Sequence, residues 1–151
     1  MYNEFPKHTL DTAPEKSKPL LKQLLEQSGP NGFYSVTAES PETLAAYAML
    51  HKAFMASSFT NEEKTVIWQS INVENECHFC VPAHTYMAKN MKIDKSVSDA
   101  LRDETALPTA RLEALRDFTL LMLRNDGNAS EAEISKFLSA GYTHQNMLEV
   151  V

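Results

Sequence analysis

The feature that most constrains the fold is a series of helix-start signals along the chain. Ser40 is followed by Pro41, which is typical of a helix N-cap with proline at the first helical position. Thr60 and Ser130 are each followed three residues later by a glutamate, which is the capping-box pattern. No segment shows sustained period-two alternation with β-branched enrichment. The sequence therefore predicts an all-α fold.

The expected helices lie between these signals and the residues that end them. The first carries an apolar stripe of four leucines and ends at Gly29-Pro30, and Thr143 is expected to cap the last. The sequence predicts helices over 14–27, 31–38 and 41–56, then from Thr60 to about Asn72, through the cysteines to about Met91, near 96–102, over 109–124, from Ser130 to Gly141, and after Thr143.

Length and charge limit the classes of protein. A chain of 151 residues fits one domain, so we expect a mobile N-terminal arm over 1–12 and a single helical domain over 13–151. The formal net charge of −6 disfavours a general nucleic-acid or anionic-membrane surface. No apolar run approaches the roughly 18 residues that span a bilayer, and the start lacks an apolar signal-peptide stretch. A cytoplasmic protein is expected.

The sequence contains only two cysteines, Cys77 and Cys80. A bridge between positions so close in sequence closes a tiny loop and cannot staple a fold. The pair therefore indicates redox or metal chemistry in a reducing compartment.

If Cys77, Cys80 and His84 lie on one helix, their side chains fall within an arc of about 60°. A helix N-terminus favours the reactive thiolate, and His84 can act as a base or as a cationic neighbour. The second cysteine can then close a disulfide after oxidation. Pro82 requires the helix to begin close to Cys77 or to bend there.

Three other interpretations of the cysteine pair were weighed. The cysteines could be structural filler, since a buried cysteine is usually a small hydrophobe. Zinc could be bound by Cys77, Cys80, His84 and His78, but His78 points off the shared face and one helix is a poor tetrahedral cage. A thioredoxin-like domain would need βαβ alternation. We expect neither a metal nor a cofactor. Trp68 is expected in the core. Phe33, Tyr34 and Tyr47 fit either the core or an apolar pocket wall.

The segment from Thr65 to His84, with its C-x-x-C-x-x-x-H element, resembles the alkylhydroperoxidase D / carboxymuconolactone decarboxylase superfamily, and in particular its peroxidase-related branch. Further segments that resemble its members are 18–21, 40–47, 137–141 and 148–151. The resemblance implies a compact multi-helix AhpD-like fold with the CxxC at the N-terminus of a core helix. It also implies a homo-oligomer, a trimer or hexamer, that reduces hydrogen peroxide or organic hydroperoxides.

The same resemblance implies roles for individual residues. Cys80 would attack the peroxide, Cys77 would resolve the intermediate, and His84 matches the histidine of the family. A dithiol, or a thioredoxin-like or lipoyl reductant, would restore the thiols. The decarboxylase branch does not rely on this cysteine pair, so the two cysteines favour peroxidase chemistry.

The proton relay is where the chain departs from the family pattern. The position where the family carries a glutamate is Thr65 here, and Glu62 and Glu63 already fit a capping role. Glu74 is the nearest remaining carboxylate and is the predicted relay. Two other functions stay open at this point: a non-enzymatic redox sensor or binding module that uses the same disulfide, and a cofactor-free lyase.

Overall fold

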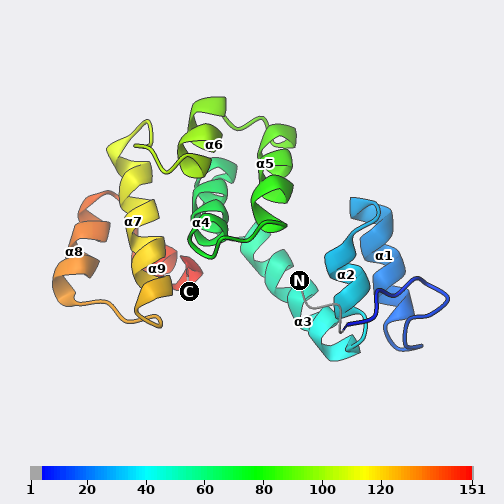
Figure 1. The fold of residues 1–151 in the computed structure, drawn as a ribbon. Coiled ribbons are helices and arrows are strands. Elements are labelled where there is room, and N and C mark those ends of the chain that lie inside the picture. The colour runs from blue at the N-terminus through cyan, green and yellow to red at the C-terminus, as the bar shows by residue number, and fades with distance from the viewer. Residues whose placement is uncertain (1–4, 151) are drawn as a thin grey trace. The chain divides into compact units, whose positions relative to one another are not determined.

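The computed structural model describes residues 5–150, and over this range the chain has nine helices and no strand, as the sequence predicts (Figure 1). The helices are α1 (Lys18–Ser28), α2 (Gly32–Thr37), α3 (Pro41–Met55), α4 (Asn61–Glu74), α5 (Cys80–Asn90), α6 (Lys95–Arg102), α7 (Ala110–Arg124), α8 (Glu131–Ser139) and α9 (His144–Val150).

The predicted helix-start signals operate as expected. Ser40 Oγ accepts a hydrogen bond from the backbone N–H of Thr43 at the start of α3. Thr60 with Glu63 and Ser130 with Glu133 form complete capping boxes, in which the hydroxyl accepts from the glutamate N–H and the carboxylate accepts from the cap N–H. Three of the predicted helices therefore begin where the local side-chain chemistry satisfies their first N–H groups.

The first helix is shorter than predicted. The expected start was Pro14, but α1 begins at Lys18, because residues 14–17 form a turn in which Ser17 N–H donates to the Pro14 carbonyl (2.8 Å). Ser17 is buried, and its hydroxyl donates to the carbonyl of Ala38, just after α2 (2.6 Å). The hydrogen bond from Ser17 to Ala38 thus holds the segment before α1, and a bond between residues so far apart in sequence cannot be predicted from the local pattern.

Part of the predicted N-terminal arm is described. Residues 1–4 of the arm and residue 151 of the predicted domain lie outside the described residues. The backbone N–H of His8 donates to the Ser35 carbonyl (2.9 Å), and its ring Nε2 pairs with the Glu39 carboxylate (2.5 Å). Mobility of the arm in solution stays a prediction.

The chain divides into two compact units, Met1–Ala56 and Ser57–Val151, and the single domain expected over 13–151 stays a prediction. The first unit contains α1, α2 and α3. Its core consists of Ala13, Leu21, Ala38 and Leu44, against which Leu20, Leu24, Leu25 and Tyr34 pack. The leucine stripe predicted for the first helix therefore faces this core.

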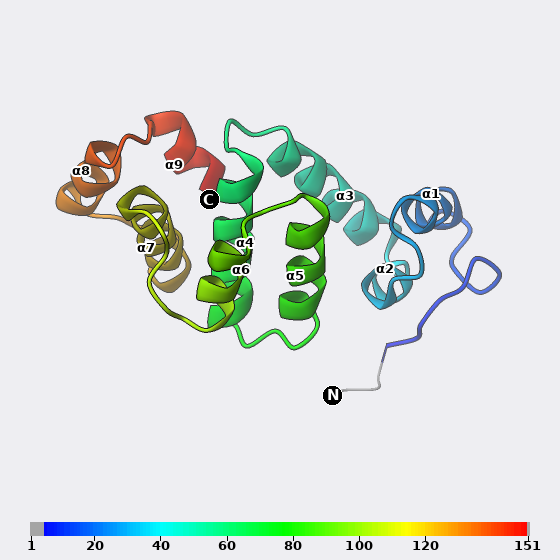
Figure 2. The ribbon, with the colours of Figure 1, turned by 90° about the horizontal axis from the view of Figure 1, so that it is seen from above.

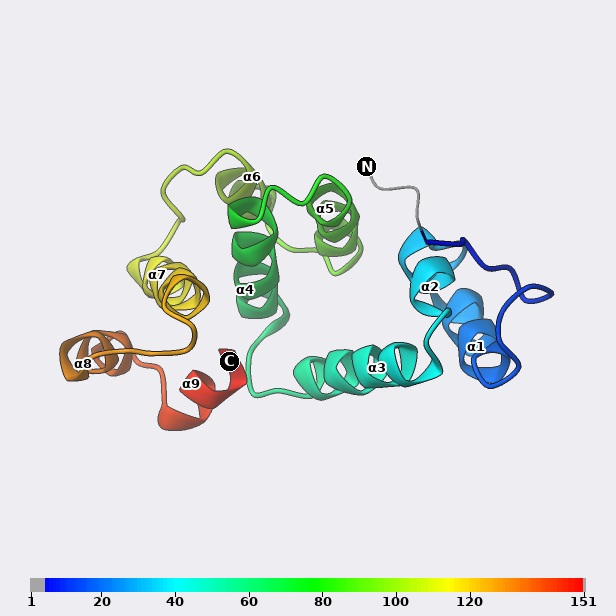
Figure 3. The same cartoon turned by 60° about the horizontal axis from the view of Figure 1, so that its bottom comes forward.

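The second unit is built around α4. Figures 1, 2 and 3 show α5 and α7 on opposite sides of α4, and α6 also packs on it. Every residue of α4 from Glu63 to Ser70 is buried. Farther along the unit, the rings of Phe118, Phe137 and Tyr142 stack in succession, with centroids 4.1 and 4.5 Å apart. The helices α5, α6 and α7 all pack on α4, so α4 is the buried centre of this unit, and the buried side chains of α4 form the surface on which α5 rests.

None of the described helices is both long enough and apolar enough to span a bilayer.

Candidate active site

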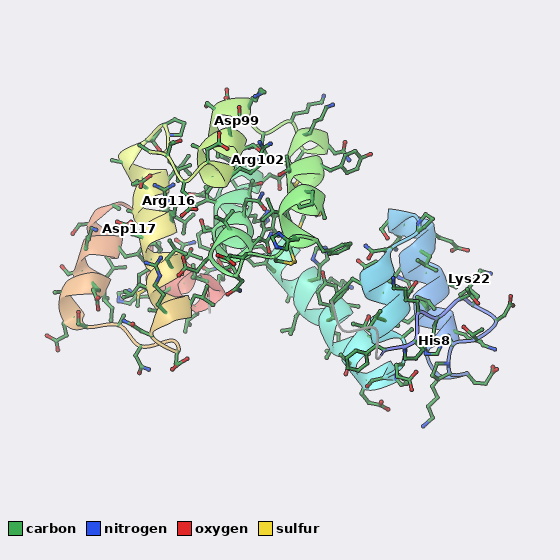
Figure 4. The ribbon with its side chains drawn as sticks, in the orientation of Figure 1. His8, Lys22, Asp99, Arg102, Arg116 and Asp117 are labelled. Carbon is green, nitrogen blue, oxygen red and sulfur yellow. A yellow bond between two sulfur atoms is a disulfide. The ribbon has the colours of Figure 1, made fainter. Side chains whose placement is uncertain are left out.

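The two cysteines form a disulfide at the start of α5 (Figure 4). The Cα atoms of Cys77 and Cys80 are 5.2 Å apart, and the backbone N–H of Cys80 donates to the Cys77 sulfur (3.1 Å). The expectation that Cys77, Cys80 and His84 share one helix is wrong for Cys77. It lies in the turn before α5, whereas Cys80 is the first helical residue.

A helix C-cap motif places Cys77 outside the helix. After α4, Glu76 adopts a left-handed backbone (φ 48°), and its N–H donates to the Val73 carbonyl (2.9 Å). The N–H of Cys77 reaches back to the Asn72 carbonyl (2.9 Å). These two bonds are the pair that defines a Schellman motif. Cys77 is therefore anchored by its backbone to the last turn of α4.

Because α5 begins only three residues after Cys77, the helix can accommodate a proline at position 82. Phe79 is the N-cap residue, so Pro82 occupies the first turn of α5, where a missing N–H leaves no helical bond unmade. The N–H of Val81 donates to the Cys77 carbonyl (3.0 Å). Of the two predicted consequences of this proline, the helix start close to the cysteines is the one observed.

His84 follows Cys80 by one helical turn and contacts α4. Its ring meets Trp68 edge to face, with centroids 4.8 Å apart and an interplanar angle of 72°. Trp68 is buried, as expected for a core residue. The residues between the cysteines are on the surface, since His78 is exposed and Phe79 has 54% of its surface accessible. The site thus combines a solvent-facing CxxC turn with a histidine held against an indole.

Gln69 is a site residue that the sequence analysis missed. It is 1% exposed, and its Nε2 donates to the Val81 carbonyl (3.1 Å) and to Thr85 Oγ1 (3.2 Å). Its Oε1 accepts from Nδ2 of Asn72, whose carbonyl receives the Cys77 N–H. One buried amide therefore connects the backbone around both cysteines. Its only signal in the sequence is a polar residue directly after the apolar run that ends at Trp68.

The candidate relay, Glu74, lies at the last position of α4. Its carboxylate forms a bidentate pair with the Arg124 guanidinium (2.6 and 2.7 Å). The hydrogen bond from Arg124, with the arginine charge, holds the pKa of Glu74 below its ordinary value. Glu74 is therefore ionised at neutral pH, and the arginine orients its carboxylate.

Thr65 and Glu63, two of the other positions considered for the relay, have structural partners. Thr65 is buried, and its hydroxyl donates to the Asn61 carbonyl (2.8 Å). Burial alone would raise the pKa of Glu63, but hydrogen bonds from Thr60 and Arg111 outweigh burial and lower it. The ion pair of Glu63 with Arg111 (2.9 Å) joins α4 to α7. The predicted capping role of Glu63 is confirmed.

The described side chains do not form the zinc site considered as an alternative. Within residues 5–150, no group of three or more His, Cys, Asp or Glu side chains is placed to hold a metal ion. Both cysteine sulfurs are instead joined to one another.

Over residues 5–150 the chain thus combines an all-helical fold with a CxxC disulfide at the start of α5. No family model matches the sequence, and no curated protein matches it at a significant level. The similarity is to solved structures. One, from Ralstonia eutropha, is described as an alkylhydroperoxidase AhpD core and an uncharacterized peroxidase-related protein; it superposes with a TM-score of 0.83 at 20% identity, over 97% of this chain and 80% of that one.

A second structure, an uncharacterized peroxidase-related protein from a Silicibacter species, superposes with a TM-score of 0.79 at 21% identity, over 97% of this chain and 78% of that one. At this level of identity the likeness establishes the fold. The AhpD-like fold implied by the C-x-x-C-x-x-x-H segment is thereby confirmed.

Proposed function

We propose that the protein is a thiol-dependent peroxidase that reduces hydrogen peroxide or organic hydroperoxides through a Cys77–Cys80 dithiol–disulfide cycle. The observation that carries the proposal is the disulfide at the N-terminus of α5, with His84 one turn further on, in an AhpD-like fold. A disulfide that closes so short a loop adds little to fold stability, which favours a chemical role.

The cycle begins at Cys80. Its thiolate attacks the terminal peroxide oxygen, the O–O bond breaks, and the alcohol (water, for hydrogen peroxide) leaves after taking up a proton. Cys80 is then a sulfenic acid. The Cys77 thiol attacks this sulfur, the disulfide forms and water leaves. An external dithiol reduces the disulfide, and its two electrons and two protons restore both cysteines.

The assignment of Cys80 as the attacking residue is supported by its place in the fold. It is the first residue of α5, an eleven-residue helix, whereas Cys77 precedes the helix. The N–H groups at a helix start favour negative charge, and this stabilises the thiolate of Cys80 over that of Cys77. Cys77, anchored to α4 through its N–H, is the resolving residue.

His84 and Glu74 are proposed to move the protons. His84 can accept the Cys80 thiol proton from one helical turn away and return it to the leaving alcohol. Glu74 is the proposed relay, because its pairing with Arg124 keeps it as an ionised carboxylate next to the turn that carries Cys77. The hydroxyl of Thr65 does not ionise near neutral pH, so Thr65 cannot relay a proton in the way that a carboxylate does.

The proposed partners follow from the cycle and from the surface. The reductant is a dithiol, or a thioredoxin-like or lipoyl protein, because only a dithiol closes the cycle in one exchange. A homo-oligomer, a trimer or hexamer, is supported by large apolar side chains that are exposed in the single chain: Met49 (72%), Leu50 (71%) and Leu148 (80%). The cytoplasm is the proposed location, since the cycle needs a reducing pool.

The direct test is peroxide consumption with excess dithiothreitol or dihydrolipoamide as reductant. The native protein should turn over many equivalents, and Cys80→Ser should abolish consumption. Without a reductant, Cys77→Ser should consume one equivalent and retain a Cys80 sulfenic acid, because no second thiol of the chain resolves it. A disulfide that peroxide forms once, with no repeated peroxide consumption in the presence of the dithiol, would instead indicate a redox switch. Peroxide consumption by Cys80→Ser would refute the assignment of Cys80.

A further inference from the structure

A groove runs along the side of the cysteine helix, between α5 and α6. It has a volume of about 710 Å³, within the range of small-molecule sites in proteins. Its wall on α5 begins at Val81 and Pro82, directly after Cys80, and continues through Tyr86 to Lys89. Pro82, Tyr86 and Lys89 share one helical face, about 10 Å long from the first of them to the last. The groove lining therefore begins at the two residues that follow Cys80, on the flank of α5 away from the Cys80 side chain, and neither cysteine is among its lining residues.

The groove combines an apolar wall with positive charge. Val81, Pro82, Tyr86 and Ile93 supply apolar surface, and 66% of the surface of the Tyr86 side chain is accessible. Lys89, Lys95 and Arg102 supply three cations against the single carboxylate of Asp99. The whole chain, in contrast, has 14 Lys and Arg against 20 Asp and Glu. The groove is thus locally cationic on an acidic protein.

The carboxylate in the groove is already engaged. Asp99 pairs with Lys95, one turn away on α6 (Figure 4 labels Asp99 and Arg102 on this helix). Neither Lys89 nor Arg102 forms an ion pair with any residue between 5 and 150. Two cations at an apolar groove, with no carboxylate partner in the described chain, are complementary to a ligand that has an aliphatic body and an anionic end.

We propose that the α5–α6 groove binds an aliphatic carboxylate, with its hydrocarbon chain along Pro82 and Tyr86 and its carboxylate on Lys89 or Arg102. A second step rests on the proposed peroxidase function: the substrate is then an aliphatic acid whose chain is long enough to pass the first turn of α5 and present its hydroperoxide to Cys80. The site would distinguish such a substrate from uncharged hydroperoxides through KM, because the carboxylate is bound away from the reacting oxygen.

Binding is tested first, without a peroxide. Decanoate is titrated into the full chain and followed by calorimetry and by backbone amide NMR. Saturable binding is expected, with the largest shifts at Val81, Tyr86 and Lys89. The double variant Lys89→Gln/Arg102→Gln should weaken binding at least tenfold, and Tyr86→Ser should also weaken it. Lys22→Gln, the same change at a lysine on α1, should leave binding unchanged.

Three results would overturn the groove assignment. They are the absence of saturable decanoate binding, binding undiminished in the double variant, and shifts that map outside α5 and α6. Tight binding of a polyglutamate peptide or of phosphatidylglycerol vesicles, with none of decanoate, would also overturn it in favour of an acidic protein partner or a membrane surface.

Kinetics then separate the groove from the proposed function. With a carboxylated aliphatic hydroperoxide, the double variant should raise KM at least tenfold with kcat unchanged, and with tert-butyl hydroperoxide it should change neither. If decanoate binds but no hydroperoxide is turned over by the native protein, the peroxidase proposal fails and the groove stands. If tert-butyl hydroperoxide is turned over but decanoate does not bind, the groove proposal fails and the peroxidase stands.

Discussion

The buried side chain of Gln69 donates a 3.1 Å hydrogen bond to the carbonyl of Val81, the residue that follows Cys80. The same side chain accepts from Asn72, whose carbonyl holds the N–H of Cys77. The backbone on both sides of the disulfide is therefore tied to one point on α4. Since α4 is itself enclosed by α5, α6 and α7, the geometry of the CxxC turn depends on the packing of the second unit.

Replacing Gln69 with leucine should loosen the first turn of α5. The change leaves the Val81 carbonyl without its side-chain donor, so we expect a loss of about 1–3 kcal/mol in the free energy of unfolding. Looser thiols close a disulfide less readily, so the midpoint potential should become less negative by about 30 mV. Urea unfolding and equilibration with dithiothreitol measure the two quantities. Gln145→Leu, at an exposed glutamine of α9, is the matched control and should leave the potential unchanged. An unaltered potential in Gln69→Leu would contradict a positioning role.

Replacing His84 with asparagine should affect rate far more than folding. As the proposed acceptor of the thiol proton, His84 should contribute about 10²–10⁴-fold to peroxide reduction. Steady-state kinetics across pH, together with thermal melting, check this prediction. The control is His144→Asn on α9, where the histidine is exposed. If both variants react like the native protein, His84 is a packing residue on Trp68.

The Glu74–Arg124 pair allows the relay to be separated from an ordinary ion pair. Glu74→Gln and Arg124→Gln each break the pair, but only the first removes the carboxylate. If Glu74 relays the proton, Glu74→Gln should lower the rate of peroxide reduction at neutral pH and Arg124→Gln should not. Arg124→Gln should raise the pKa of Glu74 toward its ordinary value and move the acid limb of the rate profile to higher pH. Equal melting losses with unchanged rates would make Glu74 structural.

The same pair has a defined effect on stability. The pKa of Glu74 is depressed in the folded state, so its contribution is present above its unfolded pKa of about 4.3 and is lost as pH falls through the lower folded value. The difference in melting temperature between the native protein and Glu74→Gln should therefore shrink in acid. Melting curves at neutral and acid pH measure it, and a difference that grows in acid would contradict the assigned pKa direction.

Gly141 should be the least replaceable glycine with a left-handed backbone. Its φ is +90°, and a Cβ there would lie 2.8 Å from Nη1 of Arg111, which donates to the Gly141 carbonyl. Gly127 (φ +80°) has nothing within 4 Å of its added Cβ, so it is the matched control. Gly127→Ala should cost about 1–2 kcal/mol in backbone strain alone. Gly141→Ala should cost about 1 kcal/mol more, because the arginine hydrogen bond is also disturbed. Equal costs in urea unfolding would contradict this role of Arg111.

The sequence predicted well those parts of the fold that are encoded over a few residues. The caps at Ser40, Thr60 and Ser130 act within four residues, so the starts of α3, α4 and α8 could be located. The cysteine helix was predicted to include Cys77, and this is wrong because Glu76 adopts a left-handed backbone, which is uncommon for a residue other than glycine. The start of α1 was misplaced for a related reason, since Ser17 bonds a carbonyl 21 residues away.

The reactive residues of the site could be predicted from the sequence, but the hydrogen bonds and ion pairs that hold them in place could not. The spacing of Cys77, Cys80 and His84 indicated thiol chemistry, and the disulfide is present. The link from Gln69 to Val81 joins two helices, and the pairing of Glu74 with Arg124 spans 50 residues. Neither can be read from a local pattern. The boundary between the two compact units has no local signal in the sequence, because residues 56–58 carry neither proline nor glycine.

The measurement that tests the central claim most directly is the reaction of the fully reduced protein with one equivalent of hydrogen peroxide, with no reductant present. Thiol titration and intact mass should show the loss of both thiols and of two hydrogen atoms per chain. Peptide mapping should find the Cys77–Cys80 bond seen in the structure. Retention of both thiols, with the peroxide unconsumed, would contradict the account.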